Sequence, residues 1–332
     1  MRRRFIVTGG AGYVGSHLVA ALADRGEDVV VLDDLRLGHR EAVPSGVKLL
    51  EIDLADAPRV DAVLADGPWQ AVFHFAARSL VGESMAKPFQ YLTENGAVGI
   101  RLVEACVRHR VGAFVLSSTA NVYGNPQVVP IPEEAPLATT SPYGESKLMV
   151  ERALHWAGQI HGLPSACLRY FNAAGADPAG RLGEDHTPET HLIPLAIDAA
   201  LGRAPELVVF GEDYDTPDGT CVRDYVHVTD LAEAHLLALD RLGEGSVTYN
   251  LGNGAGYSVR EVIRAVEAVG RRRVPARMGP RRPGDPAALV ASSARIRRET
   301  GWTPRHADLH EMVRTAYAWR EGHPHGYRRT AG

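Results

Sequence analysis

Thr8-Gly9-Gly10-Ala11-Gly12-Tyr13-Val14-Gly15 is the stretch that decides the fold of this chain. The apolar run 5–7 precedes it and a helical pattern over 16–25 follows it, so it joins a predicted buried strand to a predicted helix. Glycines at such a junction let the backbone turn sharply and approach a pyrophosphate, which then lies against the helix N-terminus. The spacing of Gly9, Gly12 and Gly15 differs from the commoner G-x-G-x-x-G, and glycines also mark ordinary turns. The stretch therefore predicts a dinucleotide-binding loop, with a tight turn that binds no ligand as the alternative.

Apolar and amphipathic runs alternate through the first half of the chain. Buried strands are predicted at 5–7, 29–32, 48–51, 71–74, 113–116 and 166–169, and helices at 16–25, 89–110 and 143–160. This alternation favours a parallel sheet with helices on both faces. We therefore predict an α/β fold, a Rossmann-type doubly wound parallel sheet with a smaller C-terminal α/β lobe.

The pattern changes after Tyr170. Residues 172–188 and 279–286 are rich in glycine, proline and charged residues and are predicted loops. Between and after them we expect helices at 192–201, 230–242 and 309–319, and strands at 207–210, 226–228 and 247–251. The segment near 225–252 is predicted to return to the first domain. We expect that domain to span residues 1–175 and the smaller lobe to span 176–332.

Two acidic residues follow predicted strands at the nucleotide end of the sheet. Asp33 ends the second strand, where a carboxylate accepts hydrogen bonds from ribose hydroxyls and repels a 2′-phosphate. Asp53 ends the third strand and is placed to bind adenine. The loop and these acids together predict NAD, in preference to NADP, as the cofactor.

Tyr143 and Lys147 lie four residues apart on a helix whose start is marked by Ser141 and Pro142. Both side chains leave the same face, and an ammonium beside a phenol is expected to lower the phenol's pKa toward neutrality. Strand ends on the carboxyl side hold ligands in such sheets, and Ser117-Ser118-Thr119 ends the fifth strand. The pattern predicts proton transfer at a substrate hydroxyl, with ordinary surface neighbours at helical spacing as the alternative.

Composition excludes several classes of function. The 332 residues carry a net charge of −4, so nothing favours a nucleic-acid partner, and the arginines at 271–282 are interpreted as a solvated surface or a contact for one small phosphate ligand. Cys106, Cys167 and Cys221 are too few for a disulfide framework, and no apolar run approaches the roughly 18 residues of a membrane span. None of the 14 histidines shows metal-ligand spacing with a supporting acid. We expect a soluble, cytoplasmic protein without a metal.

Eight motifs lie along the chain in one order: TGGAGYVGSH, HFAARSLVGES, SSTANVYG, SPYGESKLMVE, LRYFNAAGA, FGEDYDTPDGTCVRDYVHVTDL, YNLGNG and RRPGD. In these motifs the chain resembles the UDP-glucose 4-epimerases, extended members of the short-chain dehydrogenase/reductase superfamily. The resemblance implies NAD-dependent interconversion of UDP-glucose and UDP-galactose through a 4-keto sugar, in galactose metabolism. It also implies a homodimer formed by the helices at 89–110 and 143–160. Related 4,6-dehydratases carry acids where this chain has Ala120-Asn121, which argues against dehydration.

The resemblance implies a role for each matching residue. Tyr143 is the base and then the acid, Thr119 binds the same substrate hydroxyl, and Lys147 binds the nicotinamide ribose. The implied NAD-binding residues are Gly9, Gly12, Tyr13, Val14, Gly15, Asp33, Asp53, Leu54, Phe75, Ala76, Ala77, Asn95, Ser117, Tyr143, Lys147 and Tyr170. The implied substrate-binding residues are Ser118, Thr119, Tyr143, Asn172, His191, Leu192, Val209, Phe210, Arg223, Arg282, Asp285 and Leu289.

Three positions differ from the family pattern. Ser79, with Arg78 just before it, stands where narrowly glucose-specific members have a lysine, and His191 stands where many relatives have a uridine-side asparagine. Leu289 replaces a bulky tyrosine of members that reject N-acetylated sugars, so we hypothesise some activity on UDP-N-acetylglucosamine. A UDP-N-acetylglucosamine or UDP-pentose 4-epimerase, a net dehydrogenase and a non-catalytic NAD sensor are the alternatives.

Overall fold

The computed structural model describes residues 2–282 and 285–327. Its main sheet is built from β1 (Arg4–Thr8), β2 (Asp28–Asp33), β3 (Lys48–Glu51), β4 (Ala71–His74), β5 (Phe114–Thr119), β6 (Ser165–Tyr170) and β11 (Val247–Leu251). The seven strands lie in the order β11-β6-β5-β4-β1-β2-β3, and every pair is parallel. Strand order reverses next to β1, so the carboxyl ends of β1 and β4 flank a crevice that binds ligands in such folds. The predicted doubly wound sheet is confirmed.

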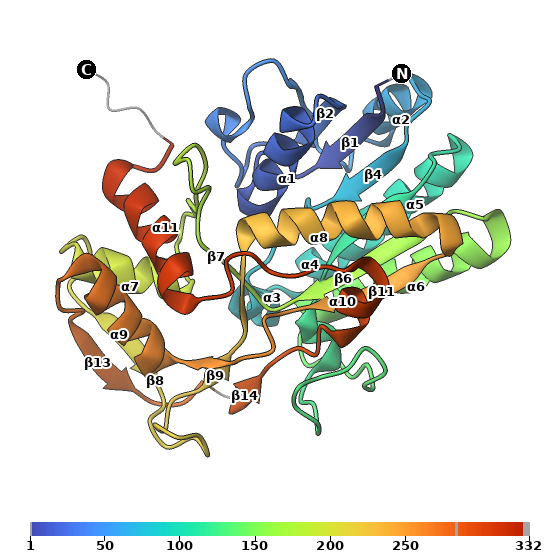
Figure 1. Cartoon of the computed structure of the whole chain (residues 1–332). Helices are drawn as coiled ribbons and strands as arrows, with labels where there is room; N and C mark the ends of the chain where they lie inside the picture. Colours follow the sequence, from blue (N-terminus) through green and yellow to red (C-terminus); the bar gives the residue numbers. More distant parts are fainter. Residues whose placement is uncertain (1, 283–284, 328–332) are drawn as a thin grey trace.

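Helices cover both faces of this sheet (Figure 1). Alternate residues of each strand point to opposite sides, so Phe5 and Val7 enter one core while Ile6 enters the other. The first core contains α1 (Tyr13–Asp24) and α8 (Val228–Arg241), with Ile296 of α10 (Ala294–Thr300). The second contains α2 (Ala57–Ala65), α5 (Val98–Arg108) and α6 (Pro142–His161). Strands that are buried on both faces explain why the sequence shows continuous apolar runs.

The helix predicted over 89–110 consists of three segments. They are α4 (Pro88–Tyr91), a π-helical turn (Leu92–Ala97) and α5, and α3 (Val81–Ala86) precedes them. The wider turn directs Asn95 at the backbone of Arg78, where its amide accepts from the N–H and donates to the carbonyl, each at 2.9 Å. Helix propensity cannot distinguish a π turn from an α turn, because the two differ only in whether the backbone hydrogen bond joins residues five or four apart.

A second group of elements packs around its own core beside the sheet (Figure 1). Its helices are α7 (Leu192–Ala200), α9 (Val259–Gly270) and α11 (Leu309–Gly322). Its paired strands are β8 (Leu207–Phe210) with β13 (Ala276–Gly279), β7 (Asn172–Ala174) with β10 (Tyr225–His227), and β9 (Val222–Arg223) with β12 (Tyr257–Ser258) and β14 (Ala288–Leu289). Short 3-10 turns lie at Arg40–Ala42, Ala120–Tyr123 and Leu242–Glu244.

Two predicted segments need correction. The strand predicted at 226–228 does not join the main sheet, because β10 pairs with β7, which lies inside the predicted loop 172–188. The chain instead returns to the main sheet through α8, which packs on one face of the sheet, and through β11, which pairs with β6. Within the predicted loop 279–286, Pro283 and Gly284 lie outside the described residues.

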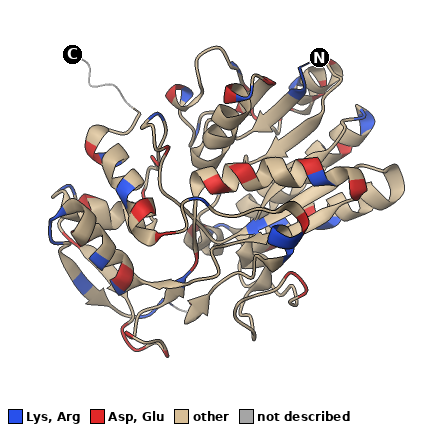
Figure 2. Cartoon of the chain, in the orientation of Figure 1, with Lys and Arg blue, Asp and Glu red and all other residues tan. Residues whose placement is uncertain are grey.

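Acidic and basic residues are interspersed over both groups of elements (Figure 2), as the net charge of −4 leads one to expect. Among the helices in the described part of the chain, none combines the length and the apolar character that crossing a membrane requires.

Candidate functional site

One cavity of about 1830 Å³ lies between the carboxyl ends of the sheet strands and the second group of elements. A site for one small ligand usually measures roughly 300–1,000 Å³, so this cavity has room for a dinucleotide and a second large ligand together. Its lining includes, of the predicted residues, Gly9, Gly12, Tyr13, Val14, Gly15, Asp33, Asp53, Leu54, Phe75, Ala76, Ala77, Asn95, Ser117, Thr119, Tyr143, Lys147, Tyr170, Asn172, His191, Leu192, Val209, Phe210, Arg223, Arg282, Asp285 and Leu289.

The glycine loop forms one end of the cavity. Gly9 has φ +69°, and a Cβ on it would lie 2.4 Å from the backbone nitrogen of Ala76, so only glycine fits between β1 and β4. Gly12 is the N-cap of α1, and no side chain caps this helix. The first N–H groups of α1 therefore remain available to an anion. This end suits the pyrophosphate of a dinucleotide.

Asp33 and Asp53 lie beyond this loop, at the ends of β2 and β3. The carboxylate of Asp33 accepts from the N–H of Ala11 at 3.0 Å and from that of Leu35 at 2.9 Å, while burial raises the pKa of this carboxyl. Each oxygen keeps a lone pair for a ribose hydroxyl. Asp53 is about half exposed and accepts from the N–H of Ala55 at 2.9 Å. Together with the glycine loop, these acids fit NAD.

Tyr143 and Lys147 reach the centre of the cavity from the start of α6. Ser141 caps this helix by accepting from the N–H of Gly144 at 3.1 Å, and Pro142 occupies its first turn, as predicted. The ammonium of Lys147 donates to the carbonyl of Ser117 at 2.8 Å. This bond holds the lysine against the end of β5, beside the phenol.

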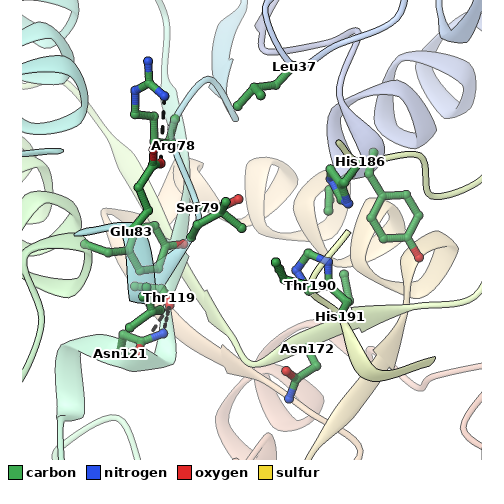
Figure 3. A pocket seen from close by; sticks show the side chains of 18 of the residues that line it. Leu37, Arg78, Ser79, Glu83, Thr119, Asn121, Asn172, His186, Thr190 and His191 are labelled. Carbon is green, nitrogen blue, oxygen red and sulfur yellow. Dashed lines mark hydrogen bonds and ion pairs between the residues drawn. The ribbon is translucent and has the colours of Figure 1, made fainter. Parts of the chain in front are cut away.

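The hydroxyl of Thr119 is oriented by a neighbour that the sequence analysis missed. Its oxygen accepts from the backbone N–H of Asn121 at 3.2 Å and from the side-chain amide of Asn121 at 3.1 Å, as Figure 3 shows. With both lone pairs engaged, the hydroxyl proton is left to donate, and a hydrogen bond from Thr119 lowers the pKa of Tyr143. The signal in the sequence was an amide two residues after the strand-end threonine.

The predicted lowering of the phenol's pKa by Lys147 is wrong for this geometry. Burial raises the pKa of Tyr143 and outweighs the hydrogen bond from Thr119. Burial also lowers the pKa of Lys147 to about 8, although the charge of Glu151 opposes that shift. The desolvation of both groups decides these directions, and the lysine rather than the tyrosine titrates near neutrality.

Ser118 does not line the cavity, which corrects its predicted role. It lies on β5 between Ser117 and Thr119, so its side chain points to the opposite face of the sheet. There its hydroxyl donates to Glu151, whose carboxylate pairs with the buried guanidinium of Arg169. Ser118 belongs to this buried polar network.

The far end of the cavity carries two arginines. The guanidinium of Arg282 lies over the ring of Phe210, 4.1 Å from its centroid. Arg223 forms an ion pair with Asp285, whose carboxylate is partly exposed. Two planar cations beside an aromatic ring and a carboxylate suit a diphosphate attached to a nucleoside.

Asn172 and Leu289 lie between the two ends. The amide of Asn172 donates to the carbonyl of Asp224 at 2.8 Å, which fixes its carbonyl oxygen in the cavity wall. Leu289 lines the cavity and packs against a buried cluster that includes Tyr123 and Ile131. Opposite them, the guanidinium of Arg78 bonds to Glu94 at 2.6 Å, so this arginine is already engaged by a carboxylate.

A histidine and glutamate cluster in the cavity wall was also missed. Glu184, His186, Glu189 and His191 bring one potential ligand atom each to within 4.8 Å of one another. Figure 3 shows His186 and His191 together on the wall opposite Arg78 and Ser79. The sequence signal was the spacing E-x-H-x-x-E-x-H. The structure thus brings together a donor set that the prediction of no metal site overlooked.

Comparison with known proteins gives consistent matches over nearly the whole chain. Residues 5–252 match the model of the NAD dependent epimerase/dehydratase family. The chain is 53% identical to the UDP-glucose 4-epimerase of Azospirillum brasilense, over 95% of this chain and 91% of that protein. It superposes with a TM-score of 0.92 on the UDP-glucose 4-epimerase of Brucella ovis in complex with NAD, at 43% identity over 95% of this chain and 98% of that one. The TM-score is also 0.92 for the enzyme of Bifidobacterium longum in complex with NAD⁺ and UDP, at 37% identity over 97% and 99% of the two chains.

Proposed function

The chain belongs to the NAD dependent epimerase/dehydratase family, and from this premise we propose that it interconverts UDP-glucose and UDP-galactose by epimerisation at C4. One observation carries the proposal. A single cavity holds a dinucleotide cradle at one end, an arginine and aromatic pocket at the other, and Tyr143 with Thr119 between them. When the UDP moiety of a UDP-sugar is bound at the far end, its sugar lies at the centre of the cavity, beside the phenol of Tyr143.

NAD, when bound, supplies a hydride acceptor and donor and a positive charge beside the phenol. We propose that the uncapped N-terminus of α1 and the carboxylate of Asp33 hold its pyrophosphate and its adenosine ribose. We propose that Tyr170, whose hydroxyl shares a hydrogen bond with that of Ser117 at 2.5 Å, closes the wall at the other end of the cofactor.

Proton transfer is assigned to Tyr143. Its phenolate takes the proton of the sugar 4-hydroxyl and returns it when the 4-keto sugar is reduced on its other face, so one group serves as base and then as acid. Thr119 is oriented by Asn121 to donate, which stabilises the phenolate. Lys147 contributes a positive charge that is present below pH about 8.

The UDP moiety is assigned to the far end of the cavity. Arg223 and Arg282 provide planar donor forks for the diphosphate. Phe210 and Asp285 are placed for the uridine, with the ring of Phe210 already covered on one face by Arg282. Asn172 faces the sugar from the wall. These anchors retain the nucleotide while the 4-keto sugar turns.

Conversion without added cofactor is the test. Purified protein should convert UDP-galactose to UDP-glucose, and the reverse, to one common ratio over many turnovers with no NAD supplied. Denaturation of the same sample should release NAD. A dehydrogenase would instead stop after about one turnover per chain and resume on addition of NAD, and that result would overturn the proposal.

We also propose that the chain forms a homodimer. Apolar side chains are exposed near and along α4 and α6, including Phe89 at 81%, Trp156 at 61% and Ile160 at 67% exposure. Large apolar side chains exposed on these helices favour burial against a second copy. Light scattering should give twice the chain mass for the wild type, with Trp156→Glu shifting the mass toward the monomer. Val128→Glu, at an equally exposed position on a loop, is the matched control.

We propose that the chain works as two functional units, with residues 1–175 and 225–252 forming the dinucleotide unit and the rest of 176–332 forming the nucleotide-sugar lobe. The core shared by α7, α9 and α11 contains no residue of the main sheet, which supports two units. Their boundaries interlock, because Ile296 and Trp302 pack into the first core of the main sheet while Ala174 and Tyr225 pack into the core of α7, α9 and α11. Substitution of Arg282 should weaken UDP binding without changing NAD content, and a loss of both would contradict the division.

We propose a cytoplasmic location. The three cysteines are free and two of them are buried, as expected of thiols in a reducing compartment. Cell fractionation tests this, and recovery of the protein outside the cytoplasmic fraction would contradict it.

A further inference from the structure

The histidine and glutamate cluster lies on the chain just before α7. The Nδ1 atom of His191 is 2.8 Å from Oε1 of Glu184 and 2.9 Å from Oε1 of Glu189. The Nδ1 atom of His186 is 3.2 Å from the same oxygen of Glu184. Four donor atoms from one eight-residue stretch therefore converge on one small volume.

One carboxylate oxygen of the cluster, Oε2 of Glu189, is buried without a hydrogen-bond partner. Its charged neighbours are Nδ1 of His186 and Nη1 of Arg320, each 3.8 Å away. The side chain of Glu189 is only 9% exposed and that of Glu184 only 7%. An unpartnered oxygen on a carboxylate that is more than nine-tenths buried is costly unless a cation lies against it.

The charge balance of the surroundings leaves room for two positive charges. Arg320 on α11 approaches Oε2 of Glu189 to 3.8 Å, but its guanidinium is engaged by Asp198, to which Nε donates at 3.0 Å. Asp198 is shared between Arg320 and Arg203, the latter at 4.0 Å. Among the described residues, the carboxylates of Glu184 and Glu189 accept no hydrogen bond from an arginine. Either two imidazolium ions or one divalent cation neutralises them.

We propose that Glu184, His186, Glu189 and His191 bind one divalent transition-metal ion of the zinc type. Two imidazole nitrogens with two carboxylate oxygens are ligands that Zn²⁺ accepts in a tetrahedral site. The preference of imidazole for zinc, copper, iron and nickel over magnesium and calcium argues for a transition metal. Four protein ligands leave no position open, so the site is structural.

The position of the site gives it a consequence for the cavity. His191 immediately precedes α7 and is the N-cap residue of that helix, without a side-chain cap hydrogen bond. Figure 3 shows Thr190 and His191 at the cavity, beside Asn172. A metal that ties His191 to Glu184 fixes this part of the wall and the start of α7. None of the four residues takes part in the proton transfer assigned to Tyr143, and Zn²⁺ binding is measured without turnover, so the proposal is tested separately from the reaction.

Calorimetric titration of the chelator-treated full-length protein with Zn²⁺ at pH 7 measures the stoichiometry and the affinity together. We expect one Zn²⁺ per chain. Glu189→Gln and His186→Ala should weaken binding at least about tenfold, since even groups that only support metal ligands cost 10–100-fold. Asp185→Asn is the matched control, because this carboxylate lies in the same segment but accepts from the N–H of Tyr327 at 3.0 Å. It should bind Zn²⁺ as the wild type does.

The absence of stoichiometric Zn²⁺ binding would overturn the proposal, as would equal affinity in Glu189→Gln. The cluster would then be a network of ion pairs between the two glutamates and the two histidines. If the variants do not fold, the titration of the wild-type protein with Zn²⁺ alone tests the proposal. Co²⁺ should give the intense visible absorption of a tetrahedral site, and a weak octahedral spectrum would count against the proposal.

Discussion

Replacement of Glu151 by glutamine tests whether the network behind the catalytic helix supports both stability and catalysis. Glu151 lies on α6, accepts from the hydroxyl of Ser118, and pairs with the guanidinium of Arg169 through Nη2 and Nε, the latter at 3.0 Å. The side chains of the pair are 7% and 6% exposed. Glutamine keeps the shape but removes the charge, which leaves a buried guanidinium uncompensated.

The expected loss is large for this reason. Breaking a buried ion pair by removing one partner costs about 3–5 kcal/mol. For a chain of this size, 1 kcal/mol corresponds to about 2–4 °C in the melting temperature, so we expect a fall of roughly 6–20 °C. Glu145→Gln on the same helix is the matched control, since its pair with Arg152 spans 3.7 Å at the surface and a glutamine carbonyl can still accept the hydrogen bond from Thr139. An exposed pair is worth about 0–1 kcal/mol.

The same substitution should also change the pH dependence of turnover. Burial lowers the pKa of Lys147 to about 8, and the charge of Glu151 raises it against that effect. Without the carboxylate the ammonium loses its proton at lower pH, so the alkaline fall of kcat/KM should move to lower pH. Urea unfolding and initial rates between pH 6 and 9 measure both effects. Stability within about 1 kcal/mol of the wild type, with an unmoved alkaline limb, would refute the reasoning.

Three further outcomes are expected. Tyr143→Phe should lower kcat about 10²–10⁴-fold, the contribution of a general acid–base group, with little change in melting temperature. Tyr91→Phe is the control and should retain most activity, because the hydroxyl of Tyr91 bonds to Glu83. Full activity in Tyr143→Phe together with a large loss in Tyr91→Phe would reject Tyr143 as the base. Leu289→Tyr should depress turnover of UDP-N-acetylglucosamine selectively, so equal loss with UDP-glucose would remove its role in pocket size. Burial lowers the pKa of His74 to about 3, below the unfolded value of about 6.5, so unfolding free energy should fall by up to about 1.4 kcal/mol per pH unit for this group as pH drops from 6.5 toward 4. A flat stability profile over that range would contradict the neutral, buried state of this histidine.

Much of the fold was predictable because its signals are local. The glycine loop between a strand and a helix, and strands buried on both faces, follow from sequence pattern alone. The pairing of β7 with β10 was missed, since each strand has three residues and the pairing joins positions 172–174 and 225–227. A contact of such short strands over such a separation leaves no period to detect.

The errors at the site have a common physical origin. The side chain of Ser118 points to the opposite face of β5 from those of Ser117 and Thr119. Because both faces of this strand are buried, the residue types do not reveal which face lines the cavity. The pKa of Tyr143 depends on a burial that is settled by tertiary packing. The donor set at Glu184–His191 lies on an irregular segment, where spacing in sequence does not fix spacing in space.

The helix α6 connects the cavity to the interior of the sheet through three residues spaced four apart. Tyr143, Lys147 and Glu151 lie on successive turns of one face, so a phenol in the cavity, an ammonium beneath it and a buried carboxylate follow one another. Desolvation drives the ammonium toward its neutral form and the carboxylate opposes this. Because the positive charge of Lys147 adds to the hydrogen bond from Thr119 at the phenolate, a carboxylate that touches no ligand extends the pH range over which this charge is present. The acid–base chemistry of the cavity thus depends on an ion pair on the opposite face of the sheet, and stability and catalysis should respond together when that pair is broken.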